Sequence, residues 1–126
     1  MIQSKEQYLS LIEQILPLEI LEYFEVKDIQ IQSKEIHLYL DELNTVPEGY
    51  SGEKLTSKGF HSEAIIQDFP LRNKALYLHV RRRRWEVESS GKVVSRTWNL
   101  VAEGTRYSKE FASFLKGLLG YLPNKQ

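Results

Sequence analysis

The sequence predicts an α+β fold: an antiparallel β-meander of about five strands, with helices before it and one helix after it. Apolar residues recur at helical spacing near both ends of the chain, and they alternate with polar residues in its middle part. Clusters of Gly, Pro, Asn and Ser separate the alternating stretches, as turns do. With 126 residues, the chain is expected to form a single domain, residues 1–126. A domain of this size buries about two thirds of the surface of its unfolded chain.

Residues 1–25 are expected to be helical and acidic. Ser4 to Gln7 form a capping box, in which the Ser4 side chain accepts a hydrogen bond from the Gln7 amide. An apolar stripe at helical spacing follows, and Pro17 ends the first helix and can start a second one. The predicted core positions of these helices are Tyr8, Leu11, Ile12, Ile15, Leu16, Leu18, Leu21 and Phe24.

Residues 26–102 are expected to form the antiparallel sheet. Alternation between Ile29 and Leu40 predicts a hairpin that turns at Ser33-Lys34. Residues 41–60 have few apolar side chains and many turn residues, which predicts a long loop. The further strands are expected at residues 64–69, 75–87 and 93–101. The second of these would span about 40 Å, so its far half is expected to project beyond the core or to be redirected by a bulge.

A last helix is expected at residues 105–120, with Ser108 or Thr105 as its cap. Its predicted buried stripe comprises Phe111, Phe114, Leu115, Leu118 and Leu119.

The formal charge of the chain is zero, but it is distributed unevenly. Residues 1–50 contain 3 Lys and Arg against 10 Asp and Glu, whereas residues 51–126 contain 14 against 7. Such a division predicts an acidic scaffold half and a basic working half. The chain begins without the features of a signal peptide, and no apolar run approaches the ~20 residues that span a bilayer. We therefore expect a soluble, cytoplasmic protein.

The residues that enzymes and metal sites need are scarce. The chain has no cysteine, which excludes disulfides and thiolate zinc sites, and its three histidines are widely spaced. No phosphate-binding glycine loop or nucleophile motif is present. The sequence predicts neither catalysis nor a metal or other cofactor.

Four consecutive arginines, Arg81 to Arg84, are followed directly by Trp85. One interpretation is a solvated strand end, whose charge prevents edge-to-edge aggregation. The other is a phosphate-binding surface, because guanidinium groups pair with phosphate oxygens and stack on bases. Tyr77 and Trp85 offer stacking groups, and no acidic residue balances the run locally, so nucleic acid is the favoured partner. Trp85 is expected to be partly buried.

The stretch around this run resembles the N-terminal region of bacterial insertion-sequence transposases. Residues 68–74, which begin Asp68-Phe69-Pro70-Leu71, match the family's Asp-apolar-Pro-Leu motif and short turn, and residues 75–85 match its alternating strand and basic run ending in an aromatic residue. Residues 103–107 resemble the family's continuation, and residues 24–44 resemble the start of one subgroup. These transposases open with a zinc-ribbon-like module, ahead of a helix-turn-helix and a catalytic domain with an acidic triad.

Two departures from the family affect what the resemblance implies. Val87 and Ser90 stand where zinc-binding members carry cysteines, so the metal is expected to be lost. The chain also stops where the helix-turn-helix would begin. It is expected to be either a fragment or one frame of an element whose enzyme is encoded separately. The resemblance therefore implies the DNA-handling front end of a transposase without its catalytic domain.

The leading hypothesis is a DNA-binding module that positions a transposase on the ends of its element. Arg81 and Arg83 are expected to point at phosphate, and Glu86 or Glu88 is expected to occupy Arg82 and Arg84. The candidate nucleic-acid-binding residues are Arg81, Arg82, Arg83, Arg84, Trp85, Lys74, Lys92, Arg96, Arg106 and Lys109.

The competing hypothesis is a protein-interaction module that docks a separately encoded transposase subunit through the acidic half or the long loop. Cross-strand pairing of the arginines with Glu86, Glu88 and Glu103 would favour it, because such pairing neutralises the basic surface. An inactive remnant is the third possibility.

Overall fold

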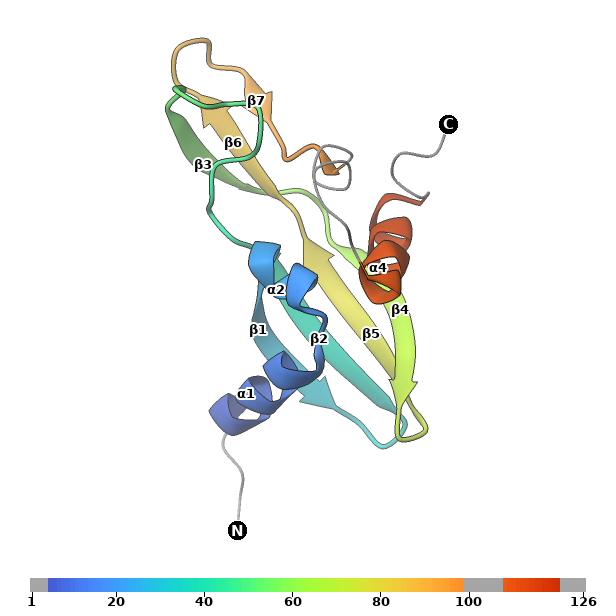
Figure 1. Ribbon diagram of the computed structural model, residues 1–126. Helices are drawn as coiled ribbons and strands as arrows, with labels where there is room; N and C mark the ends of the chain where they lie inside the picture. Colours follow the sequence, from blue (N-terminus) through green and yellow to red (C-terminus); the bar gives the residue numbers. More distant parts are fainter. Residues whose placement is uncertain (1–4, 99–107, 121–126) are drawn as a thin grey trace.

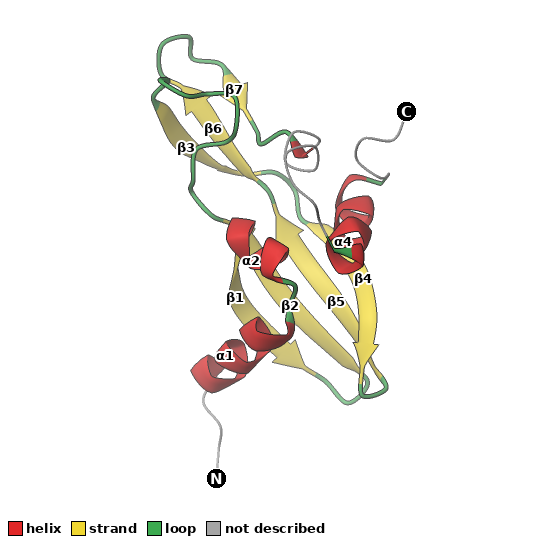
Figure 2. Ribbon diagram, viewed as in Figure 1, coloured by secondary structure: helices red, strands yellow, loops and turns green. Residues whose placement is uncertain are grey.

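Two β-sheets adjoin end to end, and helices cover one face of the larger sheet (Figure 1, Figure 2). The computed structural model describes residues 5–98 and 108–120, and the fold class is α+β as predicted. The helices are α1 (Lys5–Ile15), α2 (Leu18–Tyr23) and α4 (Lys109–Leu119). The strands are β1 (Phe24–Ile31), β2 (Glu35–Glu42), β3 (Leu55–Phe60), β4 (Ala64–Leu71), β5 (Lys74–Arg81), β6 (Arg83–Val87) and β7 (Val93–Val94).

The larger sheet has the strand order β1-β2-β5-β4. The predicted hairpin of β1 and β2 is confirmed, but β2 and β5 pair in parallel, with His37 opposite Tyr77 and Tyr39 opposite His79. The expected simple meander is therefore wrong at this central pair. The reason is that the chain leaves the larger sheet after β2, forms β3 in the smaller sheet, and returns as β4 in the opposite direction. β5 then runs beside β2 with the same polarity.

Strands β3 to β6 form one long hairpin that bends in the middle. Its two-residue turn, Arg72-Asn73, has φ values of 51° and 69°, which match the twist of the flanking strands. The half near the turn belongs to the larger sheet, and the other half belongs to the smaller sheet, whose order is β3-β6-β7. The bend lies at Arg82, between β5 and β6, where the Arg82 carbonyl accepts from the His61 amide at 2.8 Å.

The structure corrects three predictions in this part of the chain. The expected long loop at residues 41–60 ends in strand β3, which pairs with β6 and contains a bulge where Gly59 has a φ of 86°. The expected single strand at residues 75–87 is divided at Arg82 into β5 and β6, so the run is redirected between the two sheets. The strand expected at residues 93–101 is short, because only Val93 and Val94 pair with β6; residues 99–101 lie outside the described ranges.

The core lies between the larger sheet and its helices. The inward-facing residues of β2 and β5, such as Leu38, Leu40 and Leu78, are fully buried. The predicted stripe of α4 is confirmed: four of its residues are buried, and Leu119 packs partly against the core. The Ser108 hydroxyl caps this helix by accepting from the Phe111 amide at 3.1 Å. The predicted cap at Ser4 and the alternative cap at Thr105 lie outside the described ranges.

The N-terminal stripe is buried only in part. Ile12 of α1 and Leu16, which follows the helix, are in the core. Leu11 and Ile15 are exposed, because α1 lies against the edge strand β1 and presents only a narrow face to it. In α2 the buried residue is Ile20 instead of the expected Leu18.

Candidate nucleic-acid interface

Alternate members of the arginine run meet different surroundings because the run crosses from β5 to β6. The Arg81 guanidinium forms two hydrogen bonds to the Asp41 carboxylate, at 2.7 and 2.6 Å. It also lies 4.1 Å from the centroid of the Phe60 ring. The hydrogen bonds with Asp41 raise the pKa of Arg81 above its ordinary value. Arg81 therefore stays charged, but its charge is already paired with that of Asp41. This pair spans the parallel pairing of β2 with β5, which we call the seam.

Arg83 is held by groups of the protein as well. Its Nε donates to the main-chain carbonyl of Glu42 at 3.0 Å, and its Nη1 donates to the Ser57 hydroxyl at 2.6 Å. The Arg83 amide donates to the Glu42 carboxylate at 2.9 Å, and the guanidinium lies 4.7 Å from the Phe60 centroid. Arg81 and Arg83, which were expected to point at phosphate, thus join the two sheets to each other.

Arg96 is a buried structural residue. Its Nε donates to Glu42 at 2.8 Å, its Nη1 to Glu48 at 2.9 Å, and its Nη2 to the carbonyl and hydroxyl of Thr45 at 2.8 and 3.0 Å. Its side chain is 2% exposed and that of Glu42 is 1% exposed. Burial raises the pKa of Glu42, although hydrogen bonding to Arg96 acts in the opposite direction. Arg96 is therefore not accessible to a nucleic acid.

Trp85 is also part of the interior. It is 1% exposed, and its indole nitrogen donates to the Asn44 side chain at 2.8 Å. Neither face of its ring is available for stacking on a base. The burial is more complete than the sequence predicted, because the segment after β2 folds over the ring and supplies Asn44 as its polar partner.

Arg82 and Arg84 differ from their neighbours. Both are partly buried, and neither forms an ion pair within residues 5–98 and 108–120. Glu86, an expected partner, instead pairs with Lys58 at 3.1 Å. The other expected partner, Glu88, accepts a hydrogen bond from Thr56 at 2.9 Å.

His61 is influenced by both of these guanidinium groups, and its amide donates to the Arg82 carbonyl. Burial lowers the pKa of His61, and the charges of Arg82 and Arg84 lower it further. The Nε2 atom of His61 lies 2.6 Å from the Ser95 hydroxyl. Arg82, Arg84, His61 and Ser95 together form what we call the arginine–histidine patch. It combines two guanidinium groups with a hydroxyl, and these groups can bind the oxygens of a phosphate.

The remaining described candidates are not among the residues of this patch. Lys74 is at the opposite end of β5 and donates to the Ser33 carbonyl at 2.7 Å. Lys92 lies in the turn between β6 and β7, and Lys109 begins α4. Arg106 lies outside the described ranges. The nine described candidates are therefore not brought together as one surface, because Trp85 and Arg96 are buried and Lys74 lies at the far end of β5.

Sequence reasoning missed a chain of hydrogen bonds on the face of the larger sheet that carries no helix. His37 Nδ1 lies 2.7 Å from His79 Nε2, and each ring is also bound to a carboxylate: His37 to Glu35 at 2.8 Å and His79 to Glu63 at 3.0 Å. Ionised carboxylates only accept, so the two outer ring nitrogens carry protons and the central contact needs one more. The 42-residue separation of the two histidines gave no pattern that could have revealed the pair.

The described residues contain no cluster of three or more metal-ligating side chains of a kind that holds a metal ion. Within the same ranges, no helix combines the length and apolar character needed to cross a membrane. No family model, curated protein or solved structure matches the chain.

Proposed function

We propose that this protein is a non-catalytic DNA-binding module of an insertion-sequence transposase, located in the cytoplasm, and that it binds phosphate through the arginine–histidine patch. The observation that carries the proposal is that Arg82 and Arg84 have no acidic partner among the described residues, whereas Arg81, Arg83 and Arg96 are held by groups of the protein. A phosphate would supply the negative charge that the two guanidinium groups lack. The resemblance around residues 68–85 supports a transposase as the larger context.

The expected binding is weak and indifferent to sequence. Contacts to phosphate position a protein on a duplex but carry no information about base sequence. Trp85 is buried and offers no ring for stacking, so the patch supplies charge and hydrogen bonds only. In this proposal, recognition of the element ends depends on a helix-turn-helix that would lie on another segment or another chain.

A salt titration tests the proposal. We would measure the fluorescence anisotropy of a short labelled DNA duplex with the full chain at several salt concentrations. Each neutralised phosphate contributes about −0.9 to the slope of log K against log salt, so two contacts give a slope of about −2. Replacing Arg82 and Arg84 with glutamine should bring the slope close to zero.

Arg81→Gln is the matched control, because Arg81 is already paired with Asp41. It should leave the slope unchanged. Undetectable binding at low salt would overturn the proposal. A slope that depends on Arg81 as strongly as on Arg82 and Arg84 would also overturn it. Circular dichroism of each variant shows that the comparison is made between folded proteins.

The protein-interaction hypothesis is the second candidate, and one observation favours it. Acidic residues other than the expected Glu86 and Glu88 pair with part of the basic set: Asp41 binds Arg81, and Glu42 binds Arg96 and the Arg83 main chain. Carboxylates therefore neutralise Arg81 and Arg96. A docking role needs a different surface, which the helical side of the larger sheet provides.

A further inference from the structure

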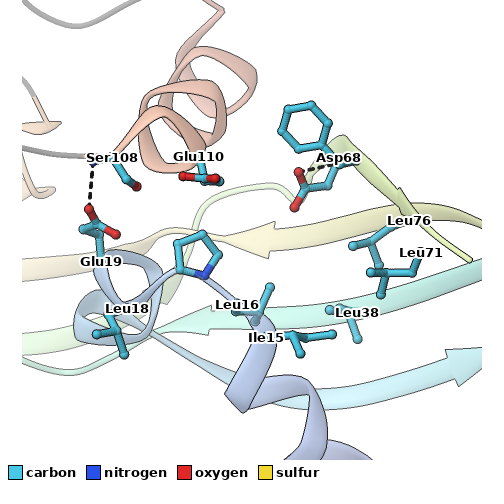
Figure 3. Close-up of a pocket in the computed structure, with 12 residues that line it drawn as sticks. Ile15, Leu16, Leu18, Glu19, Leu38, Asp68, Leu71, Leu76, Ser108 and Glu110 are labelled. Atoms are coloured by element: carbon cyan, nitrogen blue, oxygen red, sulfur yellow. Dashed lines mark hydrogen bonds between the residues drawn. The ribbon is translucent and has the colours of Figure 1, made fainter.

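An open groove lies on the helical side of the larger sheet, between α1 and α2 on one flank and α4 on the other (Figure 3). Its volume is about 430 Å³. Leu38 of β2, Leu76 of β5 and Leu71 of β4 form part of its lining, and the first two of these are buried core residues. The groove thus lies over the sheet between the helices, with the buried side chains of Leu38 and Leu76 beneath it.

Large apolar side chains border this groove and remain exposed. Ile15 at the end of α1 is 52% exposed, Leu18 at the start of α2 is 77% exposed, and Phe69 of β4 is 64% exposed. They come from three different elements but line the same groove. Such a grouping of exposed apolar residues around an apolar depression is typical of a protein-binding site.

The groove is acidic. Glu19, Asp68 and Glu110 line it, and its lining includes no Lys or Arg from the described part of the chain. In Figure 3 these carboxylates lie along one side of the groove, and the apolar side chains of Ile15 and Leu38 lie along the other. Burial acts to raise the pKa of Glu19, but hydrogen bonds from Ser108, whose amide donates at 2.9 Å, and from its own backbone lower it overall. Glu19 is therefore charged at neutral pH, and the groove attracts a cationic partner.

We propose that this groove binds an amphipathic helix of a partner protein, with an apolar stripe flanked by lysine or arginine. A helix is about 10–12 Å wide and would complete the helical layer over the sheet. Apolar side chains at positions i, i+3, i+4 and i+7 would enter the groove beside Leu18 and Phe69. Basic residues on the helix margins would face Glu19, Asp68 and Glu110. The proposal is independent of DNA binding, because it uses the opposite end of the larger sheet from Arg82.

A second copy of this chain is a less suitable occupant. A symmetric dimer formed through the groove would bring the three carboxylates of both copies into one interface, with no Lys or Arg from the described lining to balance them. Like charges facing one another in an interface oppose association.

The test is a selection from a displayed library of helical peptides. The stripe positions vary among apolar and polar residues, the flanking positions vary among Lys, Glu and Gln, and the bait is the full chain. We expect selected peptides to be apolar at the stripe positions and to carry Lys at the flanks. Phe69→Ser combined with Leu18→Gln should weaken the best peptide tenfold or more, whereas Leu11→Gln, an equally exposed position of α1 outside the groove, should leave its affinity unchanged.

The charge contribution is tested separately. Glu110→Gln should weaken a selected peptide by about two- to fivefold, the range expected for an exposed ion pair. Glu13→Gln, an exposed carboxylate outside the groove, is the control and should have no effect. Selection of glutamate at the flanks, or of peptides indifferent to the Phe69 and Leu18 changes, would overturn the proposal. Sedimentation that shows a dimer abolished by Leu18→Gln would overturn it as well, because the occupant would then be a second copy.

Discussion

Replacing Arg96 with methionine should destabilise the fold strongly. The change keeps a long, flexible apolar stem but removes the four hydrogen bonds that the guanidinium donates to Glu42, Glu48 and Thr45. Glu42, 1% exposed, would keep only the Arg83 amide as its donor among these contacts. A charged carboxylate would then be buried without the ion-pair partner that it has in the parent protein.

The size of the effect follows from this burial. Removing one partner of a buried ion pair costs about 3–5 kcal/mol, against a total stability of about 5–15 kcal/mol for a domain. The matched control is Arg81→Met, which breaks an ion pair whose arginine is half exposed. Exposed pairs contribute about 0.2–1 kcal/mol. The same substitution should therefore have a several-fold smaller effect at Arg81.

The assay is urea unfolding of both variants and the parent protein at pH 5 and pH 8. Burial already holds the pKa of Glu42 above its ordinary value of 4.5, and losing Arg96 should raise it further. A carboxyl group with a raised folded-state pKa stabilises the fold fully below its unfolded-state pKa, and this contribution is lost as the pH rises through the folded-state value. The Arg96 variant should therefore be less destabilised at pH 5 than at pH 8. A loss below about 1 kcal/mol at pH 8, or an equal loss at both pH values, would refute this reasoning.

Three further predictions concern single residues. Trp85→Ala should cost about 3–5 kcal/mol in urea unfolding and leave the DNA affinity of the folded protein unchanged; a stable variant with weaker DNA binding would contradict the burial of this ring. Gly117→Ala should lower the melting temperature despite the higher helix propensity of alanine, because the added Cβ would lie 2.7 Å from Ile66 Cγ2. A higher melting temperature would show that the Ile66 side chain moves to make room for the Cβ. His61 should titrate below 6.5 by NMR, and Arg84→Gln should raise the pKa of His61. An unchanged pKa in this variant would show that the Arg84 charge does not act on His61. Because the folded-state pKa is lowered, the stabilisation linked to His61 is present above pH 6.5 and is lost as the pH falls through the folded-state value.

Features that depend on neighbouring residues could be predicted from the sequence. Helix α4 has its cap and its buried stripe within one stretch of the chain, and the β1–β2 hairpin has its alternation and turn in another. Strand β3 was missed because its segment, Leu55-Thr-Ser-Lys-Gly-Phe60, is mostly polar and contains a bulge glycine. Its pairing with β6 is what makes it a strand.

The partners of the arginines could not be predicted, because they depend on contacts between distant segments. Asp41 and Glu42 lie some 40 residues before the arginines they bind, and they reach them only because β2 and β5 pair in parallel. The sequence predicted that the arginines would bind phosphate, and the bend at Arg82 decides which of them have no acidic partner among the described residues. Alternation along an unbroken strand could not reveal that bend.

The parallel seam between β2 and β5 has a consequence for the order of folding. It joins two hairpins, each closed by a short turn, so each can form by itself before the seam does. The Asp41–Arg81 pair and the His37–His79 contact both cross the seam, so they form only when the hairpins dock. If docking follows the transition state, Asp41→Asn should speed unfolding and leave the refolding rate nearly unchanged in stopped-flow measurements. The seam would then determine how long a folded molecule persists, while the hairpins would determine how quickly it forms.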